Sequence, residues 1–563
     1  MPPLRPLLAL AAVCVGLTTL VPATAATPTT MSDVHITARD GVDLVGDVHL
    51  PDAHGRFPAI VDLEPYGRSS STTFLGNGYA HVNTDVRGSG KSGGALCLLC
   101  TSEQQDAYDV VEWVARQPWS NGSVVLSGYS YSAITALLGA ALQPPHLRAV
   151  VVGHPPTDPY RDVLWHNGLY DQGFVEQWFA GQTGTQAVGL GPQPQYLDRK
   201  DQLFAVETRL NDLDGPLYQE RSVLAKMKKI VVPTYIYSGW DDMYSRGDLR
   251  LVDGIGAKYR RLWIDPSTHH GVGNLGEVGA PYGGGPTDAS GTSLSASPPA
   301  GEVLRWLDRF VKGKANGAER MPRVTYFDKG DRSWHNAASW NSVATQLTTY
   351  QLSGAVSSTA TSLQDGSLTT RVPTGRDAYQ ESYVYDPAAG LTVPEGKEGP
   401  DGFTPYVHGD QRVDDAQGLT FTTPALSRPL RLAGPSELRF WAVTEASDMA
   451  WVVRLADVAP DGSEQPVTQG WLRASFRNVD ASRSRPGSPY LTDDRHTPVT
   501  IGLATEYRLD IWDMAYSVPS GHRLRLWLSS SDSPTHEPVA AAGRNLIFHD
   551  ATHPSALVLN TRG

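Results

Sequence analysis

The chain has 563 residues, which is too long for one ordinary hydrophobic core, so more than one domain is expected. Hydrophobic residues make up 40% of the chain and charged residues 19%, which suits a globular soluble protein. The net charge of −12, without any Lys/Arg cluster, argues against nucleic acid and anionic membrane surfaces as partners.

The N-terminal segment has the pattern of a cleavable secretion signal. Arg5 supplies a positive charge, residues 7–21 are an apolar run, and Ala23-Thr24-Ala25 fits the small-x-small cleavage pattern. A membrane anchor is the alternative, but the run is short and is interrupted by Gly16. Residues 1–25 are therefore predicted to be a signal peptide, and the mature protein is predicted to be secreted without stable membrane association.

Strand and helix patterns alternate over residues 32–154. Apolar runs at 58–63, 80–85 and 149–152 predict strands, and valines spaced along one side predict a helix over 106–116. This alternation predicts an α/β domain with a parallel sheet.

Two of the three cysteines, Cys97 and Cys100, have a C-x-x-C spacing, whereas Cys14 lies in the predicted signal. In an exported protein the first expectation for such a pair is a local disulfide, which would stiffen its loop. A metal site would need two more soft ligands nearby, and the sequence offers none. No metal and no cofactor are predicted.

The segment Gly128-Tyr129-Ser130-Tyr131-Ser132 carries the strongest functional signal in the chain. It follows the apolar strand pattern of residues 124–126 and precedes an Ala/Leu-rich helix pattern over 133–142. A strand, a tight turn with Gly and a helix are the context of a nucleophile elbow. Ser130 is therefore the candidate nucleophile, and the N–H of Tyr131 is aimed where an oxyanion would form.

Residues 155–229 interrupt the alternation and are predicted to be an inserted helical cap over the pocket, with helices near 163–180 and 201–227. A decorative surface insertion is the alternative. The candidate residues for an apolar substrate pocket are the aromatic residues Trp165, Tyr170, Phe174 and Trp178. The cap also carries carboxylates that could hold a substrate amine, although such residues are more often solvated: Asp158, Asp162, Asp171 and Glu176.

An acid and a base follow the serine in the order that an α/β-hydrolase requires. The β-rich run 230–237 predicts a core strand that leads into Asp241 and Asp242, and a short strand at 262–264 leads into His269 and His270. Polar residues just beyond parallel strands share the ligand-binding edge of the sheet. These residues are therefore expected to meet Ser130.

The remaining sequence predicts a second domain. A helix over 302–311 is expected to close the α/β domain, whose second part is 230–314. From residue 316 to 563 short alternating runs separated by turn residues, such as 507–511 and 523–528, predict an all-β sandwich.

Several motifs resemble the cocaine-esterase/glutaryl-acylase (CocE/NonD) group of hydrolases, which is allied to the Xaa-Pro dipeptidyl-peptidases of the S15 class. The resemblance covers nearly all of the mature chain, although Ser267 stands where the group usually has Trp. The motifs that carry it are Pro65-Tyr66-Gly67, residues 85–93, 117–122, Gly239-Trp240-Asp241-Asp242, Pro266-Ser267-Thr268-His269, 455–462 and 521–526.

The resemblance implies roles for particular residues. It assigns the acid to Asp242 rather than Asp241, and the base to His269, although His270 beside it leaves that choice open. It also implies that the hydroxyl of Tyr66 completes the oxyanion hole and that the C-terminal domain is a jelly roll.

The sequence therefore predicts a secreted serine hydrolase that cleaves an ester or amide acyl bond of a small molecule through an acyl-enzyme. One alternative is an Xaa-Pro dipeptidyl-peptidase that acts on peptide N-termini. The other is a non-catalytic protein that binds through its jelly roll. The oligomeric state is left open.

Overall fold

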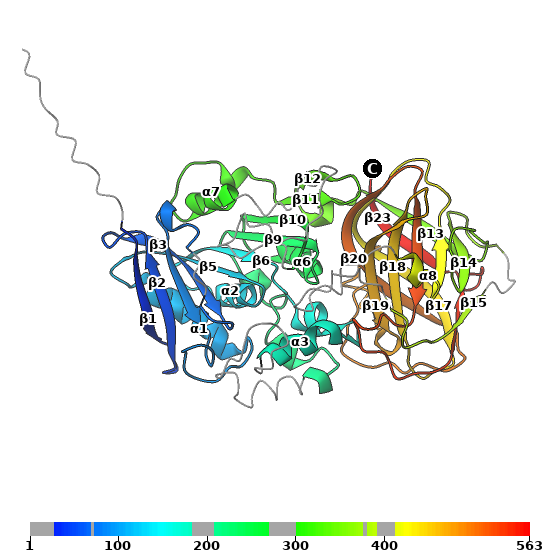
Figure 1. Cartoon of the computed structure of the whole chain (residues 1–563), viewed down its shortest axis with the longest axis horizontal. Coiled ribbons are helices and arrows are strands. Elements are labelled where there is room, and N and C mark those ends of the chain that lie inside the picture. The colour runs from blue at the N-terminus through cyan, green and yellow to red at the C-terminus, as the bar shows by residue number, and fades with distance from the viewer. Residues whose placement is uncertain (1–26, 69–71, 183–207, 270–299, 375–379, 391–410) are drawn as a thin grey trace, which may run out of the picture.

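The computed structural model of the protein describes residues 27–68, 72–182, 208–269, 300–374, 380–390 and 411–563. Figure 1 shows an α/β lobe followed by a β lobe. Across these ranges, no helix combines the length and the hydropathy that a membrane crossing requires.

The α/β lobe is built on one ten-stranded sheet with the order β1-β2-β4-β3-β5-β6-β9-β10-β11-β12. Its central strands from β4 to β11 pair in parallel, and antiparallel pairs flank them on both sides. The strands are β1 (Thr29–Thr37), β2 (Asp43–Leu50), β3 (Phe57–Glu64), β4 (Ala80–Asp85), β5 (Ser120–Tyr129), β6 (Leu147–Gly153), β9 (Thr234–Asp241), β10 (Arg260–Thr268), β11 (Val324–Asp328) and β12 (Ser333–Ala337).

Helices cover both faces of this sheet. Val124 and Leu126 of β5 share one core with residues of α1, α2 and α6, whereas Val125 packs in a second core with α7. The strand enters both cores because successive side chains point to opposite faces. The helices are α1 (Thr101–Ala115), α2 (Tyr131–Ala141), α6 (Ser245–Gly254) and α7 (Ala300–Phe310), with short turns η1 (Leu75–Asn77) and η6 (Ala318–Arg320).

Most of the predicted elements of this lobe are confirmed, with shifts of up to five residues at their ends. They are the strands at 58–63, 80–85, 124–126, 149–152, 230–237 and 262–264 and the helices at 106–116, 133–142 and 302–311.

The insertion between β6 and β9 is less helical than predicted. The first expected helix is confirmed only in part, because a hairpin of β7 and β8 precedes α3. In the described part of the second, 208–227, residues 208–210 are helical, and the turn formers around Gly215-Pro216 are followed by only a short helix. The elements are η2 (Pro159–Leu164), β7 (Trp165–His166), β8 (Leu169–Tyr170), α3 (Gln172–Gln182), α5 (Pro216–Gln219) and η5 (Met227–Lys229).

The β lobe is a barrel rather than the two separate sheets of the expected sandwich. Its strands join in one sheet, and β17 bonds to β23 as well as to β20 and β22. The long strand β17 can pair with β23, at the far end of the sheet, because a bulge at Gly434–Ser436 bends it. The elements are β13 (Gln346–Ser353), β14 (Gln364–Thr369), β15 (Gln380–Val384), α8 (Arg412–Asp415), β16 (Leu419–Thr422), β17 (Leu430–Thr444), β18 (Ala450–Val458), β19 (Glu464–Arg473), β20 (Thr505–Val518), β21 (Arg523–Ser529), β22 (Arg544–Phe548) and β23 (Ala556–Arg562), with the turns η7 (Trp340–Ser342) and η8 (Ala474–Phe476).

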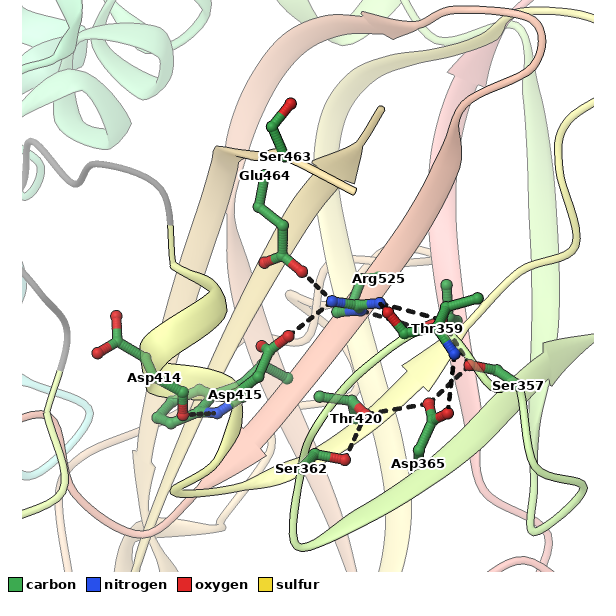
Figure 2. Close-up of polar contacts among 12 residues, drawn as sticks. Ser357, Thr359, Ser362, Asp365, Asp414, Asp415, Thr420, Ser463, Glu464 and Arg525 are labelled. Carbon is green, nitrogen blue, oxygen red and sulfur yellow. Dashed lines mark hydrogen bonds and ion pairs between the residues drawn. The ribbon is translucent and has the colours of Figure 1, made fainter. Parts of the chain in front are cut away.

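A buried ionic cluster ties α8 to the barrel strands (Figure 2). The guanidinium of Arg525 on β21 donates to Asp415 at 2.6 Å, to Glu464 on β19, and to the backbone oxygen of Thr359 at 2.8 Å. Arg454 on β18 donates to the other oxygen of Asp415 at 3.0 Å. The paired charges fix the position of α8 against the barrel wall.

The expected domain boundary near residue 316 does not coincide with the edge of the first sheet. Strand β11 lies beyond that residue and pairs in parallel with β10, and β12 then pairs with β11. This pairing satisfies the backbone groups along the free side of β10, which would otherwise be an edge. The α/β lobe therefore extends to Ala337.

Candidate active site

Ser130 lies on a sharp turn between β5 and α2. Its φ of 55° and ψ of −117° lie outside the common regions for a non-glycine residue, as a nucleophile elbow requires. Gly128 is needed here because a Cβ would lie 2.3 Å from the backbone of Ser132. The N–H of Ser130 donates to the carbonyl of Gly153 at 2.9 Å, which anchors the turn to β6.

Asp242 and His269 meet Ser130 at the carboxyl edge of the sheet. The hydroxyl of Ser130 lies 3.0 Å from Nε2 of His269, and Nδ1 of His269 donates to Oδ2 of Asp242 at 2.9 Å. Both side chains are buried. Because Nδ1 carries the proton that bonds the carboxylate, Nε2 is left with the lone pair that accepts from the serine.

The two alternatives at these positions have different outcomes. Asp241 bonds to Lys329 and takes no part in the contacts of Ser130. His270 lies outside the described residues. Glycine at position 239 allows the loop before His269 to approach, because a Cβ there would lie 2.2 Å from the backbone oxygen of Ser267.

A further histidine, His154, also contacts Asp242 and was not singled out by the sequence analysis. It follows β6 directly, and its Nδ1 donates to the same oxygen, Oδ2. The N–H of Tyr244 donates to Oδ1 at 2.7 Å. The sequence signal was a histidine placed just after an apolar strand, at the edge where the other polar groups meet.

The surroundings keep Asp242 ionised. Burial by itself would raise the pKa of this carboxyl, but the charges and hydrogen bonds of His269 and His154 outweigh it and hold the pKa well below its ordinary value. A permanent carboxylate can stabilise a positive charge on His269.

Tyr131 and Tyr66 both border the position in front of Ser130. Tyr131 is the first residue of α2, where a backbone N–H has no acceptor inside the helix. The hydroxyl of Tyr66 accepts from Nε1 of Trp178 at 3.0 Å, which leaves its own proton free to be donated. Burial raises the pKa of Tyr66 well above its ordinary value, so the hydroxyl stays protonated.

A small, mostly apolar cavity opens beside Ser130. Phe174 and Trp178 line it as predicted, whereas Trp165 and Tyr170 do not: they pack against each other with ring centroids 5.0 Å apart. The lining consists of Tyr66, Leu98, Leu99, Ser130, Tyr131, Ile134, Pro156, Pro159, Val163, Leu164, Phe174, Trp178, Arg221 and Tyr244.

One wall of the cavity is the loop closed by the disulfide between Cys97 and Cys100, which the structure confirms. Both residues between the cysteines, Leu98 and Leu99, have positive φ values of 47° and 66°. The side chain of Arg221 is directed at this loop, because its Nε donates to the carbonyl of Leu98 at 2.8 Å. The only charged residue in the described lining thus supports the wall.

Glu103 is hydrogen-bonded to the same loop. Its carboxyl accepts from the N–H of Leu99 at 2.9 Å and from the hydroxyl of Tyr131 at 2.9 Å. Burial raises the pKa of Glu103 to about 7, against the lowering effect of these hydrogen bonds. The loop and the residue after the serine therefore share one buried anchor.

The cap carboxylates do not border the described cavity. Each has another contact instead: Asp158 pairs with Arg161 at 3.1 Å, and Glu176 with Arg209 at 2.6 Å. Asp162 accepts from Thr157 at 2.9 Å, and Asp171 accepts from the N–H of Phe174 at 3.1 Å. No Asp or Glu belongs to the described lining.

Within the described ranges, two groups of side chains are close enough together to share a metal ion. One is His154, Asp242 and His269, and the other is Asp328, Asp331 and His335. The first group is joined by direct hydrogen bonds. In the second, Asp328 is engaged by Ser517 and Arg562.

Two family models match the chain. One describes the X-Pro dipeptidyl-peptidase (S15 family) and matches residues 40–271, and the other describes the X-Pro dipeptidyl-peptidase C-terminal non-catalytic domain and matches residues 316–558. The chain is a serine hydrolase of the cocaine esterase and S15 kind. The resemblance noted in the sequence is thereby confirmed.

Full-length relatives agree with the assignment of this serine hydrolase. A Mycobacterium bovis protein that carries the name serine esterase is 26% identical over 590 residues, which cover 89% of this chain and 90% of that protein. The cocaine esterase of Rhodococcus sp. is 25% identical over 602 residues, with 94% and 98% covered. A CocE/NonD family hydrolase from Staphylococcus aureus has the same fold, with a TM-score of 0.76, 19% identity and coverage of 95% and 94%.

Proposed function

We propose that this serine hydrolase cleaves esters with an apolar acyl group through an acyl-enzyme on Ser130. The observation that carries the proposal is the hydrogen-bonded series Ser130, His269 and Asp242, which opens into an apolar cavity. The fold proposed to hold it is an α/β-hydrolase domain with an inserted cap, followed by a jelly roll.

The first half of the reaction forms the acyl-enzyme. Oγ of Ser130 attacks the carbonyl carbon while Nε2 of His269 takes the hydroxyl proton, and Asp242 stabilises the resulting imidazolium. The N–H of Tyr131 and the hydroxyl of Tyr66 donate to the oxyanion. The C–O bond of the ester then breaks, and His269 gives its proton to the departing alcohol.

The second half releases the acid. A water molecule gives a proton to Nε2 of His269 and attacks the acyl carbon, and the same two donors stabilise the second oxyanion. When the bond to Ser130 breaks, His269 returns the proton to Oγ. The enzyme is then ready for another substrate.

The character of the cavity favours an ester over a peptide N-terminus. A free α-amine needs a carboxylate within hydrogen-bond reach, and the described lining offers none. The named relatives include esterases, while the two family models describe X-Pro dipeptidyl-peptidases, so dipeptidyl-peptidase activity is the second candidate. The non-catalytic alternative is set aside because the chain belongs to a family of hydrolases.

The predicted signal over residues 1–25 supports a further proposal, that the mature enzyme is secreted. The small cavity supports small-molecule substrates.

The test combines a covalent probe with a substrate panel. A fluorophosphonate is expected to label the wild-type protein at Ser130, and Ser130→Ala is expected to lose the label and to lose ester hydrolysis by at least about a thousandfold. Labelling or turnover that persists in folded Ser130→Ala would refute the proposal. Hydrolysis of Ala-Pro anilide in preference to a short acyl ester would favour the dipeptidyl-peptidase instead.

A further inference from the structure

Four neighbouring strands each deliver one polar side chain to the same edge of the sheet. The strands β5, β6, β9 and β10 are adjacent, and the residues that directly follow them are Ser130, His154, Asp242 and His269. Three of these residues, Ser130, Asp242 and His269, form the hydrogen-bonded series of the proposed mechanism. His154 is the fourth, and the steps of acyl transfer do not require it.

His154 contacts this series through Asp242. Its Nδ1 and Nδ1 of His269 both donate to Oδ2 of Asp242, while the N–H of Tyr244 donates to Oδ1. A carboxylate offers only acceptors, so Nδ1 of His154 carries a proton. With three donors on its two oxygens, the carboxylate is held against rotation.

His154 is kept in this place at a cost to the fold. Its φ of 48° lies in the left-handed region, which few residues other than glycine adopt. The ring is fully buried, and its Nε2 has no hydrogen-bond partner among the described residues. If this position served only the packing between β6 and β9, glycine or asparagine would be sufficient, because both tolerate this backbone conformation.

We propose that His154 is a positioning residue of this active site, which orients Asp242 toward His269 and draws part of the carboxylate charge away from it. The inference rests on the proposed function, since it needs His269 to act as the base. With less negative charge available to it, the His269 imidazolium is less stabilised. Removing the donor of His154 would therefore leave the carboxylate charge undivided beside His269.

Other titratable groups face this cluster and remain unchanged in every variant compared below. The rings of Tyr129 and Tyr237 lie 5.1 Å and 6.0 Å from the ring of His154, and Tyr244 lies 5.0 Å from His269. The carboxyl groups that lie near the cluster are those of Asp248 on α6 and Asp265 on β10.

The experiment compares His154→Asn with His154→Leu. Asparagine tolerates the positive φ and keeps an N–H donor close to the position of Nδ1, whereas leucine has similar bulk and no donor. The readout is the rate of inactivation by a fluorophosphonate between pH 5 and pH 9, which needs no knowledge of the natural substrate.

In His154→Leu the acid limb of this profile is expected to move up by about half a pH unit or more, and the plateau rate to fall about tenfold. His154→Asn is expected to keep the acid limb close to that of the wild type. Should His154→Leu fail to fold, His154→Gly removes the donor without backbone strain and takes its place.

Two results would overturn the inference: an acid limb in the donor-free variant that matches the wild type, or an equal shift in His154→Asn, which would make the effect one of packing. Either result leaves the proposed function intact if Ser130→Ala loses the label. Loss of the proposed function would show instead as labelling that does not depend on Ser130.

Discussion

At the scale of single residues, the site depends on groups whose protonation is fixed by their surroundings. Asp242 is kept ionised by two imidazoles, and Tyr66 is kept protonated by burial. The indole of Trp178 can only donate, so its bond to Tyr66 turns the hydroxyl proton of that residue away from it. That proton is then available to an oxyanion in front of Ser130.

Tyr66→Phe tests this role. Losing one oxyanion donor typically costs about 3 kcal/mol of transition-state stabilisation, so kcat for an ester is expected to fall roughly a hundredfold. The ring remains packed, and the thermal midpoint is expected to stay close to that of the wild type.

Trp178→Phe is the matched control for Tyr66→Phe. It removes the indole donor but leaves the tyrosine hydroxyl, so its effect on kcat is expected to be much smaller. Near-normal turnover in Tyr66→Phe would exclude the hydroxyl from the oxyanion hole.

At the scale of elements, the loop between the two cysteines is held in a backbone conformation that its leucines would not adopt alone. Positive φ values at two successive leucines are strained, and they persist only where the surroundings enforce them. The disulfide, Glu103 and Arg221 all act on this loop. The shape of one cavity wall therefore depends on the crosslink.

Replacing both cysteines by serine is expected to change selectivity more than chemistry. As the loop relaxes, KM for esters with longer apolar acyl groups is expected to rise about tenfold, because a misfit of one methylene in an apolar pocket is worth that much. Acetyl esters, which reach the wall less, serve as the internal control. An unchanged dependence of KM on acyl length would contradict this account.

The sequence predicts the parts of this fold that have a local cause. The elbow at Ser130 and the two polar loops after β9 and β10 follow from apolar runs and chain order, whereas the choice of Asp242 and His269 within them came from the resemblance. The position of His154 does not, because its contact with Asp242 depends on β6 lying between β5 and β9. Only two of the four predicted pocket residues line the cavity, since Trp165 and Tyr170 pack within the cap beside Tyr218 rather than toward the serine.

At the scale of the whole molecule, several buried carboxyls carry raised pKa values. Burial raises the pKa to about 6 in Asp62, and to about 7 in Glu103 and Asp265. Across the described ranges, no ion pair joins these three to Lys or Arg. In the unfolded chain they release their protons near pH 4.

Between about pH 4 and pH 7 these three groups therefore bind fewer protons in the unfolded state than in the folded state, and their contribution to stability falls as pH rises through this window. The thermal midpoint measured by calorimetry is expected to be about 5 °C lower at pH 8 than at pH 5. Glu103→Gln, which stays neutral, is expected to weaken this dependence. A midpoint that rises from pH 5 to pH 8 would contradict it.

The strands β11 and β12 determine where the chain can be cut into a catalytic fragment and a barrel fragment. Asp328 at the end of β11 accepts from both the N–H and the hydroxyl of Ser517 on β20, at 2.9 Å and 2.7 Å. A catalytic fragment that stops near residue 316 would expose the backbone of β10 as a template for aggregation. A cut between residues 338 and 345 would leave all ten strands of the first sheet in one fragment.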